Sequence, residues 1–232
     1  MPDVSLTPDA QRRALARALA LGLGLGAGAA WAQAGGAGAL LVDAAQRGDR
    51  ARVRALLDAG VPIEQRDARG RTAVLTATDG NHLPVVQLLI ARGADVNARD
   101  PQRDSAFLLA GARGHTAIVR ATLAAGADLA STNRYGGTAL IPACHYGHVE
   151  TVRLLLQTRI DVDHVNNLGW TALLEAVILG DGGPAHAEIV RLLIAAGAAL
   201  NLADRNGVTP LQHALQRGQT KVAALLRAAG AR

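Results

Sequence analysis

The chain is poor in several residue types, and each shortage excludes a class of protein. Its 232 residues include a single cysteine, Cys144, so neither an intramolecular disulfide nor a cysteine-based zinc cluster is possible. Aromatic side chains are limited to two tryptophans, two tyrosines and one phenylalanine. The core must therefore rest on Leu, Val, Ile and Ala. This suits closely packed short helices and argues against a β-sandwich, which favours aromatic and β-branched residues.

Lysine is almost absent as well, because Lys221 is the only lysine among 24 basic residues. With 19 acidic residues the net charge is +5. The arginines are scattered along the sequence, whereas a nucleic-acid-binding protein clusters its basic residues on one face. We therefore expect no nucleic-acid partner.

Residues 1–34 have the pattern of a signal peptide. An uncharged apolar run over residues 18–30 follows a basic stretch, and two Ala-x-Ala sites end at Ala32 and Ala34. The apolar run is too short and too rich in glycine for a stable membrane anchor. We therefore expect the chain to be exported and the mature protein to be periplasmic.

Two export routes fit the basic stretch. Arg12 and Arg13, followed by one residue of any type, two apolar residues and Arg17, resemble a twin-arginine signal. Arginine pairs are also common in signals of the general secretory (Sec) route, so both routes stay open. Either route predicts a mature N-terminus at Gln33 or Gly35.

One module recurs six times after residue 38, with a short linker expected at residues 35–38. The equivalent positions are Ala39, Thr72, Ser105, Thr138, Thr171 and Thr209. Four intervals are 33 residues long, and the fifth is 38 because residues 181–185 are inserted. Such a period predicts a solenoid in which each repeat is stable only when stacked on its neighbours. We expect repeats at about 39–71, 72–104, 105–137, 138–170, 171–208 and 209–232.

Residues 137–166 show the expected plan of one repeat. Thr138 is an N-cap candidate for a short helix over residues 139–146, which should stop at Gly147. A second helix, over about residues 148–158, has apolar residues on one face. An extended stretch then leads to the next turn. The fold class is therefore all-α, with six stacked helix-turn-helix repeats and short turn or hairpin tips.

These repeats resemble the ankyrin repeat. Thr-Ala-Leu or Thr-Pro-Leu opens the first helix at residues 138–140, 171–173 and 209–211. Gly-His joins the helices at residues 114–115 and 147–148, and Gly-Ala-Asp-Val-Asn closes a repeat at residues 93–97. The resemblance covers the chain after about residue 38 and implies a protein-binding solenoid. The insertion at 181–185 resembles that of exported bacterial ankyrin proteins, some associated with peroxide defence alongside a catalase.

Three positions depart from the ankyrin pattern. Asn81 replaces the glycine between the helices, and Asn is the residue that best tolerates a positive φ after Gly. Arg103 replaces the turn glycine, and Arg159 replaces the glycine after the second helix. We expect Arg159 to adopt a positive φ, with a strain of about 1 kcal/mol.

Groups that could carry chemistry have simpler structural explanations. Cys144 and His148 have the spacing of two metal ligands on a helix, but Gly147 should end the helix between them. We expect His148 to be a stacked structural residue and Cys144 a buried, inert thiol. Glu175 and His213 share a variable helix position but have no third partner for catalysis. We therefore expect no enzymatic activity, no metal and no cofactor.

The resemblance implies a binding surface formed by turn tips and the exposed sides of the first helices, on a concave face. Tyr, Trp and Arg dominate interface hot spots, and Ile178 and Leu179 are apolar where solvent is expected. A patch with both tyrosines, Trp170 and the inserted loop is therefore expected in repeats four and five; the alternative is that Trp170 packs on the next turn. The predicted protein-binding residues are Arg113, Arg134, Tyr135, His145, Tyr146, Leu168, Trp170, Ile178, Leu179 and Asp181.

Two functions fit this sequence. The first is a monomeric accessory or scaffold protein that binds another protein in the periplasm, such as an oxidative-stress enzyme like a catalase. The alternative is an immunity or inhibitor protein that blocks a toxin or hydrolase. Neighbouring genes would distinguish these functions, because a catalase gene favours the first and a secreted toxin gene the second.

Overall fold

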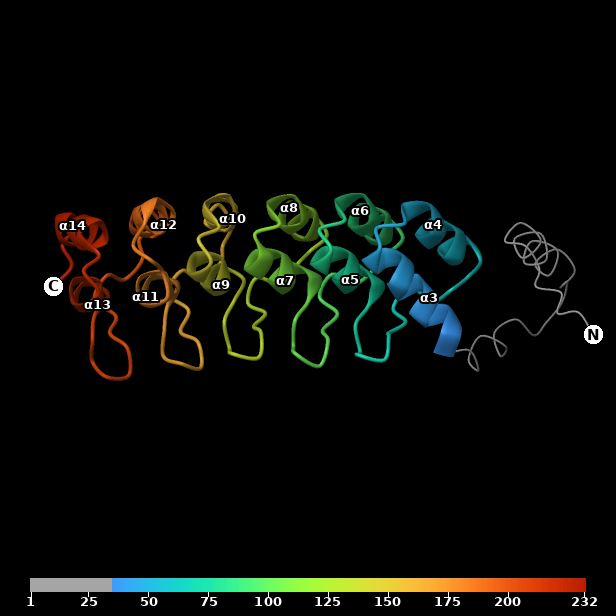
Figure 1. The fold of residues 1–232 in the computed structure, drawn as a ribbon, viewed down its shortest axis with the longest axis horizontal. Helices are drawn as coiled ribbons and strands as arrows, with labels where there is room; N and C mark the ends of the chain where they lie inside the picture. Colours follow the sequence, from blue (N-terminus) through green and yellow to red (C-terminus); the bar gives the residue numbers. More distant parts are fainter. Residues whose placement is uncertain (1–34) are drawn as a thin grey trace, which may run out of the picture. The chain divides into compact units, whose positions relative to one another are not determined.

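The computed structural model describes residues 35–232, and this part of the chain contains twelve helices and no strand (Figure 1). The helices are α3 (Gly35–Gln46), α4 (Arg50–Asp58), α5 (Ala73–Asp79), α6 (Leu83–Ala91), α7 (Ala106–Arg113), α8 (Thr116–Ala124), α9 (Leu140–His145), α10 (Val149–Leu155), α11 (Ala172–Ile178), α12 (Pro184–Ala195), α13 (Pro210–Gln216) and α14 (Thr220–Ala228). They form six consecutive pairs, which confirms the predicted all-α solenoid.

Residues 38–232 form one compact unit in which the helices stand in two rows (Figure 1). The first helices of successive pairs, α5, α7, α9, α11 and α13, lie beside the long loops that project from one side. The other row is formed by the second helices, α4, α6, α8, α10, α12 and α14. From α4 onwards, each helix packs on its equivalent in the next repeat, as α9 does on α7 and α11. Equivalent positions of neighbouring repeats are therefore side by side.

The N-terminal boundary differs from the expected one. Helix α3 begins at Gly35, so residues 35–38 belong to a helix instead of a linker. The predicted signal peptide, residues 1–34, lies outside the described residues. Within the described part, no helix combines the length and the apolar character needed to cross a bilayer.

The first helices begin as the sequence predicts in four repeats. The side chains of Thr72, Ser105, Thr171 and Thr209 each accept a hydrogen bond from the backbone N–H three residues later, at 3.2–3.4 Å. This bond satisfies a donor that the helix itself cannot pair.

The prediction that Thr138 caps its helix in the same way is wrong, and Pro142 is the reason. In the other repeats, the residue equivalent to Pro142 donates its N–H to the cap carbonyl, as Leu109 does to Ser105. Proline has no N–H to donate. The first turn is therefore tighter: the Ile141 N–H donates to the Thr138 carbonyl at 3.3 Å, and α9 spans only Leu140–His145. The Thr138 hydroxyl has no hydrogen-bond partner in the described chain.

Left-handed backbone occurs at two non-glycine residues among those described, Asn81 with φ 55° and Arg103 with φ 64°. The expectation for Asn81 is confirmed. The expectation for Arg159 is wrong, because its φ is not positive.

Thr158 removes the need for a left-handed residue at position 159. The turn after α8 contains the left-handed Gly126, and the following Ala127 N–H donates to the Thr122 carbonyl at 3.0 Å. At the end of α10, the Thr158 hydroxyl accepts from the Ile160 N–H at 3.2 Å and donates to the Leu155 carbonyl at 2.6 Å. The hydroxyl thus bridges the two groups that pair directly in α8, and no strain is required.

The loops between repeats are fixed by aspartate and asparagine side chains. In each projecting loop, one side-chain oxygen accepts two backbone N–H groups, from the residues two and four positions later, at 2.8–3.1 Å. Such turns supply the hydrogen bonds that irregular backbone otherwise lacks. The acceptors are Asp67, Asp100, Asn133, Asn166 and Asp204. These loops are therefore ordered platforms for the side chains at their tips.

A second set of side chains ties each repeat to the next. Glu64 and Asn97 accept the N–H of Asp95 and Asp128 through a side-chain oxygen, both at 2.8 Å. Asp163 and Asn201 do the same for Ala199 and Arg232, at 2.9 and 2.8 Å. The equivalent position in the third repeat is Ala130, which has no side-chain acceptor.

Candidate functional site

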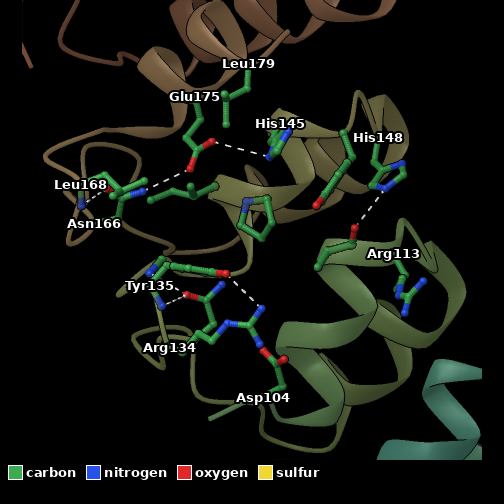
Figure 2. A pocket seen from close by; sticks show the side chains of 16 residues that line it. Asp104, Arg113, Arg134, Tyr135, His145, His148, Asn166, Leu168, Glu175 and Leu179 are labelled. Atoms are coloured by element: carbon green, nitrogen blue, oxygen red, sulfur yellow. Dashed lines mark hydrogen bonds and ion pairs between the residues drawn. The ribbon is translucent and has the colours of Figure 1, made fainter. Parts of the chain in front are cut away.

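One cleft of about 910 Å³ opens among α7, α9, α11 and the loops beside them (Figure 2). It is named the aromatic cleft here, after the two tyrosines on its rim. The residues that line it are Asp104, Ala112, Arg113, Asn133, Arg134, Tyr135, Gly137, Ile141, Pro142, His145, Tyr146, His148, Asn166, Leu168, Glu175 and Leu179. The stacking of repeats brings these positions together, because each repeat adds one helix and one loop to the same side.

Most of the side chains predicted from the sequence meet in this cleft. Those that line it are Arg113, Arg134, Tyr135, His145, Tyr146, Leu168 and Leu179. Its rim is unusually apolar for a free surface, since Tyr135 is 52% exposed, Tyr146 59%, Leu168 47% and Leu179 43%. Exposed aromatic and aliphatic groups gathered in one hollow are typical of an interaction site.

The other three predicted residues do not line the cleft. Ile178 is only 6% exposed, so the expectation that it faces solvent is wrong. It lies in the last turn of α11, a helix that packs against α9, α12 and α13. Trp170 is half-buried in the loop before α11, where its backbone N–H and carbonyl both bond to Asn166.

Asp181 is exposed, but its carboxylate organises the inserted loop. One oxygen accepts from the Gly183 N–H and bonds to His186 Nδ1, both at 2.8 Å. These hydrogen bonds, led by that of Gly183, lower the pKa of Asp181. His186 Nε2 in turn reaches the carbonyl of His145 at 2.9 Å. The inserted loop therefore keeps a histidine in contact with the preceding repeat.

The aromatic walls of the cleft are held in place by neighbouring polar groups. The guanidinium of Arg134 lies 4.7 Å from the centre of the Tyr135 ring and donates to the Tyr135 hydroxyl at 3.0 Å. The ring of Tyr146 stacks on His145 with centroids 4.2 Å apart. Because these rings are already fixed, ordering them when a ligand binds would cost little conformational entropy.

Glu175 is the most unusual group of the cleft. Its side chain is 9% exposed, and the carboxylate lies between Asn166 and His145 (Figure 2). Oε1 accepts a hydrogen bond from Asn166 Nδ2 at 3.2 Å, while Oε2 is 3.7 Å from His145 Nδ1 and has no hydrogen-bond partner in the described chain. Burial raises the pKa of Glu175 to about 7, against an ordinary value of 4.5. A buried carboxylate with one free oxygen is costly.

The equivalent position in the sixth repeat shows which interaction Glu175 lacks. There His213 Nε2 bonds to Asp204 at 2.9 Å, and Asp204 occupies the loop position of Asn166. The helix residue and the loop residue thus form a complete pair in the sixth repeat. In the fifth repeat, Asn166 donates one hydrogen bond to Glu175 and supplies no compensating charge. Sequence reasoning noted that Glu175 and His213 are equivalent but missed the contribution of the loop residue nine positions earlier.

The other ionisable groups of the cleft are engaged elsewhere or perturbed by burial. Arg113 forms an ion pair with Asp79 at 3.0 Å, on the side away from Glu175. Burial lowers the pKa of His145, and the nearby His186 adds to this effect. Burial raises the pKa of Asp104, and the charge of Asp100 contributes further.

Two groups that the sequence offers for chemistry, Cys144 and His148, have structural surroundings. Cys144 is completely buried, as expected, and burial raises the pKa of its thiol well above the ordinary value. His148 Nε2 bonds to the Ala112 carbonyl at 3.2 Å, which confirms its stacking role. Within residues 35–232, no three His, Cys, Asp or Glu side chains gather in a way that could hold a metal ion.

Comparison with known proteins supports the repeat assignment. The family model described as ankyrin repeats (3 copies) matches residues 25–100, 107–202 and 166–232. Among curated proteins, the ankyrin repeat protein YahD of Escherichia coli (strain K12) is 49% identical over 57 residues. That match spans 25% of this chain and 28% of YahD.

Three solved structures share the fold over most of their length. An ankyrin repeat domain from Acinetobacter baumannii AYE is 53% identical with a TM-score of 0.80, and the match covers 83% of this chain and 98% of that one. The ankyrin repeat protein EF0377 is 38% identical with a TM-score of 0.79, over 82% and 97% of the two chains. The ankyrin repeat domain of Bcl-3, a member of the IkappaB family, is 28% identical with a TM-score of 0.74, over 83% and 86%.

Proposed function

The chain belongs to the ankyrin-repeat family, and we propose that it is an exported, monomeric scaffold that binds a segment of another protein in the aromatic cleft. Ankyrin repeats generally form scaffolds for protein–protein interaction and are typically non-enzymatic. The observation that carries the proposal is the collection of exposed Tyr135, Tyr146, Leu168 and Leu179 around one cleft.

The size of the cleft favours a peptide segment as the occupant. A volume of about 910 Å³ is close to the upper end of ordinary ligand pockets, roughly 300–1,000 Å³. A stable protein interface buries about 1,200–2,000 Å², so the partner must also cover loop tips beside the cleft. Arg134 and Tyr135, on one tip, are of the types that contribute most to interface energy.

The N-terminal pattern supports a partner in the periplasm. The basic stretch, apolar run and Ala-x-Ala sites of residues 1–34 support export. N-terminal sequencing of the protein from intact cells should give Gln33 or Gly35 as the first residue. A cytoplasmic protein that starts at Met1 would exclude this location. Replacing Arg12 and Arg13 by lysine should stop export only if the twin-arginine route is used.

The cleft is tested by truncating its rim. The full chain, recovered from periplasm, should retain a partner that the Tyr135→Ala, Tyr146→Ala double variant loses, with affinity reduced by about 2 kcal/mol or more. Leu168→Ala and Leu215→Ala form a matched pair, because both leucines are 47% exposed and only Leu168 lines the cleft. We expect binding to fall for Leu168→Ala and to stay unchanged for Leu215→Ala.

A folded double variant that holds its partner at undiminished affinity would exclude the cleft as the binding site. The identity of the captured protein separates the two roles that the sequence suggests. A periplasmic oxidative-stress enzyme, such as a catalase, supports the accessory role. A toxin or hydrolase whose activity falls on binding supports the inhibitor role.

A further inference from the structure

The charges of the aromatic cleft are unevenly satisfied. Both of its arginines already have partners: Arg113 pairs with Asp79 at 3.0 Å, and Arg134 donates to Gln102 Oε1 at 2.8 Å and lies over Tyr135. The two carboxylates, Glu175 and Asp104, form no ion pair with a lysine or arginine in the described part of the chain. The cleft therefore has carboxylate acceptors without a cationic partner, while its arginine donors are already engaged.

Glu175 sets the chemistry that would complete the site. Oε1 is held by Asn166, so the carboxylate cannot turn away without losing that bond. Oε2 lacks a hydrogen-bond partner among the described residues, and His145 Nδ1, at 3.7 Å, is too distant to donate one. A buried acceptor left without a donor costs about 1–3 kcal/mol, more when it is charged. A donor from a ligand would recover this cost.

A cationic donor fits better than a neutral one. Hydrogen bonds between ionised groups are roughly twice as strong as those between neutral groups, and the low polarity of a buried site strengthens them further. The tyrosine rings on the rim add favourable surfaces for a guanidinium or ammonium group. The exposed Leu168 and Leu179 suit the aliphatic stem that carries such a group.

We propose that the occupant of the aromatic cleft is an extended protein segment that places an arginine or lysine side chain against the carboxylate of Glu175. The inference rests on the proposed function, because it assigns the partner's chemistry at the same cleft. Asn166 acts as a positioning residue that fixes the carboxylate. The rim tyrosines and leucines contact the residues that flank the basic side chain.

A peptide selection tests the assignment without knowledge of the partner. A random peptide library displayed on phage is selected on the immobilised full chain, and one recovered peptide is synthesised for calorimetry. A second peptide carries citrulline in place of its arginine, or norleucine in place of its lysine, which removes the charge at similar size. The protein variants are Glu175→Gln, Tyr146→Ala and Glu150→Gln, the last with the same charge change on the second helix of repeat four, outside the cleft.

The expected result is a basic residue at one fixed position of the recovered peptides. Glu175→Gln and the neutral peptide should each weaken binding about ten-fold or more, and the combination should be no weaker than either alone. Glu150→Gln should bind like the parent chain. A thermal melt of Glu175→Gln confirms that the variant is folded.

Two other outcomes overturn the inference at different levels. Peptides that need Tyr146 but carry no basic residue, or that bind Glu175→Gln equally well, would exclude the cation while leaving the cleft as a binding site. Failure to recover any peptide whose binding depends on Tyr146 would exclude the cleft and the basic side chain together.

Discussion

Ala130 interrupts a ladder of hydrogen bonds that otherwise joins successive repeats. At the equivalent positions, Glu64, Asn97, Asp163 and Asn201 accept a backbone N–H of the next repeat at 2.8–2.9 Å. Ala130 is exposed and has no acceptor, so the N–H that an asparagine there should reach, that of Asp161, receives no such bond. Restoring an acceptor should therefore stabilise the join between repeats three and four.

The size of this effect follows from the bonds already present. An asparagine at position 130 should accept the Asp161 N–H as Asn97 accepts that of Asp128, at 2.8 Å. A hydrogen bond adds about 0.5–1.5 kcal/mol net, and the exposed position favours the lower half of this range. Ala130→Asn should therefore raise the free energy of unfolding by about 0.5–1 kcal/mol in urea, with an unchanged dependence on urea concentration.

Two further variants show whether the hydrogen bond is responsible. Ala130→Leu adds a side chain of similar size without an acceptor and should give no gain. Asn97→Ala removes the intact bond between repeats two and three, together with the bond that Asn97 Nδ2 donates to the Gly126 carbonyl at 3.1 Å, and should cost about 1 kcal/mol or more. If Ala130→Asn and Ala130→Leu have the same stability, or if Asn97→Ala is neutral, the ladder contributes nothing and the reasoning is refuted.

Three other predictions concern single groups. Because the pKa of Glu175 is raised to about 7, its ionised form destabilises the fold above pH 7, and this cost disappears as the pH falls towards the ordinary value of 4.5. Glu175→Gln should therefore raise the free energy of unfolding by about 1–3 kcal/mol at pH 8 and by little at pH 5. An equal gain at both pH values would contradict this prediction. Gly114→Ala should cost about 1–3 kcal/mol more than Gly147→Ala in urea unfolding. Both glycines are left-handed, with φ 70° and 75°, so the backbone strain is similar. At Gly114 the new methyl group would lie 2.5 Å from His148, whereas at Gly147 it would lie 3.6 Å or more from any neighbour. Thr158→Ala should cost about 1–2 kcal/mol, since it leaves the Ile160 N–H at the end of α10 unpaired and removes one of the two hydrogen bonds to the Leu155 carbonyl; a neutral result would show that water replaces the hydroxyl.

The period of the repeats made much of the fold predictable. A spacing of 33 residues places equivalent residues side by side, so caps such as Thr72 and turns such as that at Asn81 follow from the repeat pattern alone. The same logic brought Tyr135, Tyr146 and Leu179 to one cleft, although they are far apart along the chain. Stacking places residues that are one repeat apart in the sequence next to one another on the same surface.

Two predictions, those for Thr138 and Arg159, failed where one residue changes the local hydrogen bonding. Pro142 removes the N–H that the first turn of its helix needs, and this could have been read from the sequence. The alternative end of α10 could not, because it depends on the direction of the Thr158 hydroxyl. Ile178 is apolar at a position that was expected to be exposed, but burial there depends on how α11 packs on three other helices.

Glu175 illustrates the limit of reading positions one at a time. A carboxylate on a short helix is ordinary, and its unusual state comes from the loop residue Asn166, which donates one hydrogen bond and supplies no charge. The sixth repeat shows that the same scaffold can complete such a pair, through His213 and Asp204. The fifth repeat therefore bears a stability cost that the fold itself does not require. A basic side chain from a partner would remove that cost only in the complex, so the group that destabilises the free chain is the one that would favour binding.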